Sequence, residues 1–240
     1  MVNITEQEVL DNAYDFFFNF FSKVAQNYSN KKYKSFKVNP FTIQATANAF
    51  GSPITVQNLA KAVVYPFALG SSIATSFGTN FQAFMVSTTG GVARASVVKG
   101  MDIEYDDALD NRHKYCQIKS GPTTINKDDI KTIEDHFKGL TNLARTNHLP
   151  LDASDKVVGV LYGTHNDLST MYRTIEHDGI NVFAGEELFY HITGIHGLYQ
   201  GLIESARRAA ENSEMQESIQ KLIKEVESGI NSHKDLYGLQ

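Results

Sequence analysis

Apolar positions in the first third of the chain recur at the spacing of a helix. Residues 4–26 carry an apolar stripe, and helical patterning returns over residues 41–49 and 55–65. Gly51-Ser52-Pro53 separates the last two segments, as expected of a loop. A further helix-like stretch ends near residue 85. The pattern therefore predicts a helical N-terminal region.

The pattern changes after Gly90-Gly91, where short runs predict strands. Val98–Tyr105 and Lys114–Ser120 flank a polar connection rich in Asp and Asn, which predicts a β-hairpin. Lys156–Tyr162 is a nearly continuous apolar run with β-branched residues, typical of a buried strand. These segments predict a sheet in the middle of the chain.

The other segments complete an alternating order of elements. Helices are predicted over residues 123–147 and 167–176, a short strand over residues 180–183, and mostly helix from residue 185 onward. Residues 214–228 are strongly charged and predict an exposed surface helix. The order of helices, hairpin, helix, strand, helix, strand and helices predicts an α/β fold with a small mixed sheet.

Composition narrows the class of protein. The 240 residues suit one domain, or one domain with a modest appendage, and a hydrophobic content of 42% is ordinary for a soluble globular protein. No apolar run reaches the roughly 18 residues that span a bilayer, so no membrane association is expected. The single cysteine, Cys116, excludes an internal disulfide and a cysteine-based zinc site, and favours the cytoplasm.

The predicted hairpin gathers polar side chains at one end of the sheet. Alternation places Asp102 and Glu104 on one face of the first strand, and Gln117 and Lys119 on one face of the second. A cluster of this kind is costly to bury unless it has a function. The structural alternative is a surface hairpin with a salt bridge between Asp102 and Lys119.

These residue types suit the hydrolysis of a phosphodiester. Carboxylate oxygens hold Mg²⁺, which polarises a phosphoryl oxygen and lowers the pKa of a bound water. Asp102 is the expected metal anchor, and Glu104, the Gln117 side chain and the Ile118 main-chain carbonyl are further candidate ligands. Lys119 is expected to orient or activate the attacking water.

The segment around these residues resembles a known family. Asp102, followed 15 residues later by Gln117-Ile118-Lys119, is similar to the PD-(D/E)XK nuclease signature. The wider text resembles type II restriction endonucleases that cut interrupted palindromes of the GGNCC kind. It comprises GMDIEYDDALDNRHKYCQIKSGPTTINKDD, the earlier SIATSFGTNFQAF, and the later DHFKGLTNLARTN and VVGVLYG.

The resemblance implies a division of the chain and a function. It implies a nuclease core over residues 66–194, between a helical N-terminal region (1–65) and C-terminal helices (195–240). It also implies Mg²⁺-dependent, sequence-specific cleavage of double-stranded DNA, as part of a restriction-modification system. The active form would be a homodimer whose helices outside the core carry dimerisation.

One position departs from the family's motif. Asp102 matches the first acidic residue and Lys119 the lysine, but Gln117 stands where Asp or Glu is usual. A neutral glutamine binds a cation more weakly, which makes Glu104 a candidate to compensate. Related nucleases also often place an acidic residue on the preceding helix, where this chain offers Gln82.

Five polar residues near the motif are candidate DNA contacts. Thr124, Asn126 and Lys127 lie where the second strand passes into a helix, whose first N–H groups favour phosphate. Arg112 and Lys114 lie toward the tip of the predicted hairpin. The alternatives are an ordinary capped loop and solvated side chains.

Other functions remain open. The net charge of −5 weighs against a nucleic-acid partner, although a DNA cleft needs only local positive potential. A repair or junction nuclease of the same fold would not give discrete fragments. A DNA-binding protein that has lost cleavage, suggested by Gln117, would bind duplex DNA without cutting it. A helical interaction protein would do neither.

Overall fold

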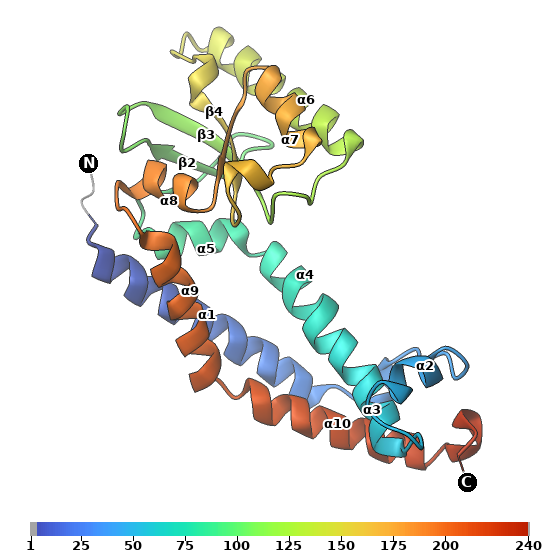
Figure 1. The fold of residues 1–240 in the computed structure, drawn as a ribbon. Helices are drawn as coiled ribbons and strands as arrows, with labels where there is room; N and C mark the ends of the chain where they lie inside the picture. The colour runs from blue at the N-terminus through green and yellow to red at the C-terminus, as the bar shows by residue number, and fades with distance from the viewer. Residues whose placement is uncertain (1–3, 240) are drawn as a thin grey trace. The chain divides into compact units, whose positions relative to one another are not determined.

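The chain folds into two compact units. The computed structural model describes residues 4–239 (Figure 1). The first unit comprises the chain up to Phe16 together with Asn80–Arg207. The second comprises Phe17–Thr79 and the chain from Arg208 onward.

The division into units differs from the expected division into regions. At two points the chain passes from one unit to the other within a helix. These helices are α1 (Glu6–Asn30) and α9 (Leu198–Asn212). Each of these helices therefore contributes to both units, whereas we expected boundaries after residues 65 and 194. In the first unit, the start of α1 packs on α9, where the Ser205 hydroxyl donates to the Leu10 carbonyl at 3.0 Å.

The first unit is built on a five-stranded mixed sheet of order β1-β2-β3-β4-β5. The strands are β1 (Arg94–Ala95), β2 (Ile103–Asp106), β3 (His113–Lys119), β4 (Lys156–Val160) and β5 (Asn181–Ala184). The first three pair antiparallel and the last three parallel. The parallel pairs are linked by α6 (Lys127–Thr146) and α7 (Thr170–His177). This arrangement confirms the α/β fold with a small mixed sheet flanked by helices.

Helices cover both faces of the sheet. On one face α6 and α7 lie side by side (Figure 1), and Phe137 packs with Val158 and Tyr172 in a buried cluster. On the other face lie α5 (Phe81–Thr88) and α8 (Glu186–Thr193), and the rings of Phe84 and Phe189 are 6.4 Å apart. Apolar residues on both faces explain why β4 lacks polar alternation.

The first strand of the hairpin is shorter than predicted. β2 begins at Ile103, and the expected residues before it form a turn in which the Met101 N–H donates to the Val98 carbonyl at 3.0 Å. Gly100 occupies the third position of this turn with φ +87°, a conformation that favours glycine. The turn ends the strand because its backbone is not extended.

The second unit is helical and has its own core. Its remaining elements are η1 (Tyr33–Ser35), α2 (Ile43–Asn48), α3 (Val56–Tyr65), the π-helix η2 (Pro66–Ser72), α4 (Ile73–Gly78), α10 (Met215–Asn231) and η5 (Lys234–Tyr237). Thr55 caps α3 by accepting the Asn58 N–H at 3.2 Å. None of the described helices is long and apolar enough to cross a membrane.

The prediction of an exposed helix over residues 214–228 is wrong. One face of α10 is buried, and Leu222, Val226 and Ile230 join a cluster with Leu59 of α3. These apolar positions recur at helical spacing between the charged ones, so a high charge content coexists with a buried stripe. α10 is therefore part of the core of the second unit.

The tip of the hairpin is held by buried charges. The guanidinium of Arg112 donates two hydrogen bonds to the Asp155 carboxylate, each 2.6 Å long. The Lys114 ammonium is 2.5 Å from Asp110 and 3.8 Å from Asp107. Because Lys114 is only 1% exposed, these carboxylates compensate for the loss of its hydration.

The same contacts perturb two carboxyl groups. Burial is the largest single influence on the pKa of Asp155 and would raise it, but the hydrogen bonds from Arg112 and from the Asp152 N–H, with the charges of Arg112 and Lys114, together hold the pKa below its usual value. Burial is also the largest influence on Asp107, but the hydrogen bonds with His191, 2.7 Å away, and from the Leu109 N–H, with the charges of His191 and Lys114, together lower its pKa. Both groups therefore stabilise the folded chain in their charged form.

We expect Asp155→Asn to lower the free energy of unfolding by about 2 kcal/mol, because it removes the buried carboxylate that accepts two hydrogen bonds from Arg112. The folded pKa of Asp155 lies below the unfolded one, so its contribution is complete above about pH 4 and is lost as the pH falls through the folded value. Denaturant unfolding at neutral and acidic pH measures this. The exposed neighbour Asp152 is the control, and Asp152→Asn should cost less than about 1 kcal/mol. Equal losses in the two variants would contradict the network.

Candidate active site

Asp102 is fixed at the point where the pairing of β2 with β3 ends. Its backbone N–H donates to the Cys116 carbonyl at 2.9 Å. Its carboxylate Oδ2 then accepts the backbone N–H of Ile118 at 2.7 Å. The side chain thus replaces a backbone acceptor, because the chain before Asp102 has already turned away at Gly100. This bond holds the carboxylate beside the end of β3.

The same gap exposes a backbone oxygen. The N–H and C=O of one residue point to the same side of a strand, so the Ile118 carbonyl also faces Asp102. Asp102 bonds to Cys116 through its backbone and to Ile118 through its carboxylate, so it lies beside Gln117, the residue between them. The structure therefore brings together Asp102, Gln117 and Ile118, three of the four predicted metal ligands.

Gln82 supports the site through the backbone. It belongs to α5, and its Nε2 donates to the Asp102 carbonyl oxygen at 2.6 Å. The sequence identified Gln82 only as a polar residue in the place of an acidic one. In the structure its side-chain amide holds the backbone carbonyl of Asp102, the candidate metal ligand. The Asp102 carboxylate bonds to the Ile118 N–H instead.

Gln117 has a neighbour that the sequence did not single out. Gln117 is 3% exposed, and its Nε2 lies 3.3 Å from Nδ1 of His136 on α6. The signal for His136 was its helical spacing with Ile133, Phe137 and Leu140, which are buried against the sheet. That spacing placed it on the inner face of α6 but gave no indication of what it would contact.

Glu104 already has partners for both of its carboxylate oxygens. Oε1 accepts the Ser96 hydroxyl at 2.5 Å, and Oε2 lies 3.2 Å from Nε2 of His113. The other ring nitrogen of His113 is 2.8 Å from Asp106. A cation bound by Glu104 would therefore share these oxygens with Ser96 and His113.

Lys119 ends β3 and shares a strand face with Gln117, two residues before it. Its side chain is partly buried, and within residues 4–239 no carboxylate oxygen lies within 4.0 Å of its ammonium. The described residues therefore do not form the Asp102–Lys119 salt bridge of the structural alternative. The ammonium keeps its charge available for a phosphate or a water.

Cys116 lies on the opposite face of β3. It is fully buried, and burial, followed by the charge of Asp102, raises the pKa of its thiol. A buried, protonated thiol is a poor nucleophile. The residue packs under Gly159 of β4, as expected of a core position.

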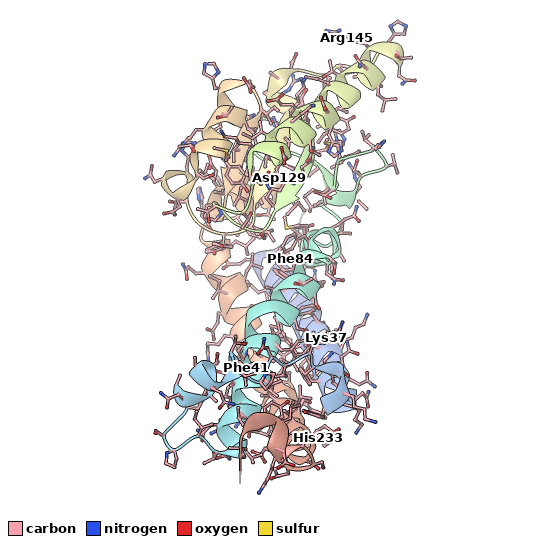
Figure 2. All side chains as sticks on the ribbon, turned by 90° about the vertical axis from the view of Figure 1, so that its right-hand side faces the viewer. Lys37, Phe41, Phe84, Asp129, Arg145 and His233 are labelled. Atoms are coloured by element: carbon pink, nitrogen blue, oxygen red, sulfur yellow. The ribbon has the colours of Figure 1, made fainter. Side chains whose placement is uncertain are left out.

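The candidate DNA contacts separate into two groups. Thr124 closes the turn after β3 by donating to the Gly121 carbonyl at 2.9 Å, and Asn126 caps α6 by accepting the N–H groups of Asp128 and Asp129. Lys127 is exposed in the first turn of α6. Figure 2 labels Asp129 in this first turn and Arg145 in the last.

Arg112 and Lys114 are better explained as structural residues. Arg112 is committed to Asp155 and Asp152, each 2.6 Å away, and Lys114 is buried among carboxylates. A phosphate could reach Lys114 only by opening this network. The sequence could not show this, because Asp155 lies 41 residues from Lys114 along the chain.

The donor set fits a hard divalent cation. Asp102 supplies one carboxylate, and Gln117 and Ile118 supply neutral carbonyl oxygens, the ligand type that Mg²⁺ prefers. Within the described residues, no group of three or more His, Cys, Asp or Glu side chains is arranged to hold a metal. A cation here would therefore bind one carboxylate and keep several waters.

A small mixed sheet flanked by helices, with an acidic residue and a lysine at the end of its hairpin, is the arrangement of a nuclease core. The family model of Type II restriction endonuclease EcoO109I matches residues 7–214 of the chain. The chain belongs to this family and is a type II site-specific deoxyribonuclease that binds DNA. No curated protein matches it.

We expect Gly100→Ala to destabilise the fold by about 1–3 kcal/mol and to reduce DNA cleavage, because φ is +87° and a Cβ would lie 2.3 Å from the His136 ring. Gly139 of α6 is the control, since a Cβ there would meet no described atom within 4 Å. Gly139→Ala should stabilise the helix by up to about 1 kcal/mol. Denaturant unfolding and cleavage assays compare the two. A Gly100→Ala protein as stable and active as wild type would show that the turn does not position Asp102.

Proposed function

We propose that the chain is a Mg²⁺-dependent restriction endonuclease that cuts a short interrupted palindrome of the GGNCC kind. The observation that carries the proposal is the hydrogen bond between the Asp102 carboxylate and the Ile118 N–H. It holds the carboxylate beside the segment Gln117-Ile118-Lys119, which offers two carbonyl oxygens and an ammonium. We further propose that it works as a homodimer in the cytoplasm. Membership of the family supports the reaction type.

Each residue of the site has a distinct role in the proposed hydrolysis. Asp102 binds the cation, and the carbonyl oxygens of Gln117 and Ile118 complete the protein's share of its ligands. Bound Mg²⁺ would supply a charge that polarises the phosphoryl oxygen and lowers the pKa of a bound water. Lys119 orients the attacking water and stabilises charge that develops on the phosphate. The products would carry 5′-phosphate and 3′-hydroxyl ends.

DNA backbone contacts are proposed for the start of α6. The exposed Lys127 adds a positive charge to N–H groups that already favour an anion. Thr124 and Asn126 order this loop through the bonds described above, so they would present Lys127 and the backbone to the phosphate. Because these residues follow directly on Lys119, the contact would lie next to the scissile bond.

The homodimer follows from the symmetry of a palindrome. Two identical half-sites are cut most simply by two copies related by a two-fold axis. We propose that helices outside the sheet-bearing unit provide the interface. The second unit exposes apolar side chains that suit this role, including Phe41, which is 87% exposed (Figure 2), and Leu236, 55% exposed.

The first test is digestion of a sequenced plasmid with the purified protein. We expect discrete fragments with Mg²⁺ and none with EDTA, and mapped ends give the recognition sequence. Lys119→Ala should slow cleavage by roughly 100- to 1000-fold, the usual effect of removing a group that stabilises transition-state charge. Lys221→Ala, an exposed lysine of α10, should cleave at the wild-type rate.

The other outcomes separate the alternatives. Cleavage of the plasmid without discrete fragments would favour a repair or junction nuclease. If the wild-type protein binds duplex DNA but leaves every plasmid intact with Mg²⁺ and Mn²⁺, the catalytic proposal fails and the DNA-binding alternative, which Gln117 suggests, replaces it.

Gln117→Glu tests the metal site directly. An added carboxylate charge should strengthen cation binding, so we expect the Mg²⁺ concentration for half-maximal cleavage to fall by roughly tenfold. A Mg²⁺ titration of the cleavage rate measures it. An unchanged titration would mean that the side chain of Gln117 does not contact the metal.

A further inference from the structure

We infer that His136 is a positioning residue for Gln117: it holds the side-chain amide so that the carbonyl oxygen, and not the NH₂ group, faces the metal. The inference rests on the proposed metal site. It adds a residue from α6, outside the two strands that carry the motif, and assigns it a role that depends on the neutral glutamine.

The His136 ring is wedged between the two parts of the motif. On one side its Nδ1 lies 3.3 Å from Nε2 of Gln117. On the other side it packs against Gly100, where even a Cβ would approach the ring to 2.3 Å. His136 therefore contacts both the turn that leads to Asp102 and the side chain of Gln117, the neighbour of Ile118.

The position of the ring is set by the helix. Ile133 is fully buried and Phe137 is 2% exposed, and both share the inner face of α6 with His136. Asn126 caps the start of this helix through two backbone N–H groups. The ring is therefore carried by a packed, capped element, which is what a positioning residue requires.

A glutamine side chain has two chemically different ends. Nε2 is a donor only, and Oε1 is the acceptor that can bind a cation. When the Nδ1 lone pair of His136 accepts the Nε2–H, the opposite end of the amide presents Oε1. Reversing the amide would direct the donor NH₂ toward Mg²⁺, which gives no coordination bond. The hydrogen bond to His136 thus selects the productive orientation.

An acidic residue at this position would not need such a partner. The two oxygens of a carboxylate are equivalent, so either one binds the cation. His136 should matter with Gln117 and lose its importance with Gln117→Glu. This dependence distinguishes positioning from a general contribution to packing, which would be felt in both backgrounds.

The test uses two substitutions of the same shape. His136→Asn keeps an acceptor near the place of Nδ1, whereas His136→Leu has similar branching and no acceptor. Mn²⁺ affinity of the full-length protein, read from the electron paramagnetic resonance signal of unbound Mn²⁺, needs no cleavage. We expect H136L to weaken Mn²⁺ binding by roughly 10-fold or more, a typical effect of losing a partner of a metal ligand. H136N should stay within about threefold of wild type.

The decisive comparison is made in the Q117E background. There H136L should change the Mn²⁺ affinity by less than about threefold, far below the typical effect of losing a ligand's partner. Asp102→Asn shows that the measured Mn²⁺ is bound at this site. Unfolding without metal shows that each variant is folded. If H136L does not fold, it is replaced by His136→Gln, which moves the acceptor away from the Nδ1 position and should lose affinity as H136L would.

The outcomes separate this inference from the proposed function. If plasmid cleavage and Asp102-dependent Mn²⁺ binding are present but H136L binds like wild type, only the role of His136 is overturned. The same holds if H136N loses as much affinity as H136L, or if the loss persists with Q117E. If Mn²⁺ binding does not depend on Asp102, the metal site itself is overturned, and the role of His136 with it.

Discussion

The site depends on one hydrogen bond that replaces a rung of the sheet. β2 stops short of the end of β3, because Gly100 turns the preceding chain away, and the last residues of β3 lose their backbone partner on that side. The carboxylate of Asp102 accepts the orphaned N–H of Ile118 and is thereby held beside the carbonyl of the same residue. A buried backbone N–H must find an acceptor, so the need to satisfy Ile118 and the need to place a metal ligand are met by the same side chain.

The two faces of the hairpin carry different tasks. One face presents Asp102, Gln117 and Lys119, whose groups are left for chemistry. The other face buries Lys114 beneath carboxylates, and the nearby Arg112 is paired with Asp155, so these charges fix the hairpin to the rest of the sheet. The cationic residues near the motif therefore differ in role. Arg112 and Lys114 stabilise the fold, whereas Lys119 has no carboxylate partner among the described residues. The acidic net charge is compatible with this division, because the field that matters is local.

Sequence patterning predicted the site to the extent that strand geometry determines it. Alternation with period two placed Gln117 and Lys119 on one face and set Asp102 near them, since these relations depend only on local backbone geometry. The prediction made the first strand too long, because a single glycine within a segment of alternating apolar and polar residues gave too weak a signal for a turn. It could not show that Glu104 is held by Ser96 and His113, that Lys114 is buried, or that His136 reaches Gln117, since each depends on packing between distant segments. The helical unit shows the same limit. The many charged residues of α10 led to the prediction of an exposed helix, although its apolar residues form a buried stripe.

Because Gln117 is neutral where the family's motif usually has an acidic residue, the candidate site carries less negative charge. In the proposed site Asp102 would be the one carboxylate on the cation, so the protein would neutralise Mg²⁺ only in part, and Lys119, which has no carboxylate partner among the described residues, would add to the positive charge. Such a site holds a cation weakly and attracts an anion strongly. In the proposed mechanism the phosphate of DNA would supply the missing negative charge, because it would bind both the metal and Lys119. Metal and DNA should therefore strengthen each other's binding by the same factor, as linkage requires. A motif with a second carboxylate would bind the metal before the DNA. Under the proposed mechanism this site would reach charge balance only with the substrate bound, and the orientation of the Gln117 amide would set how tightly the metal is held.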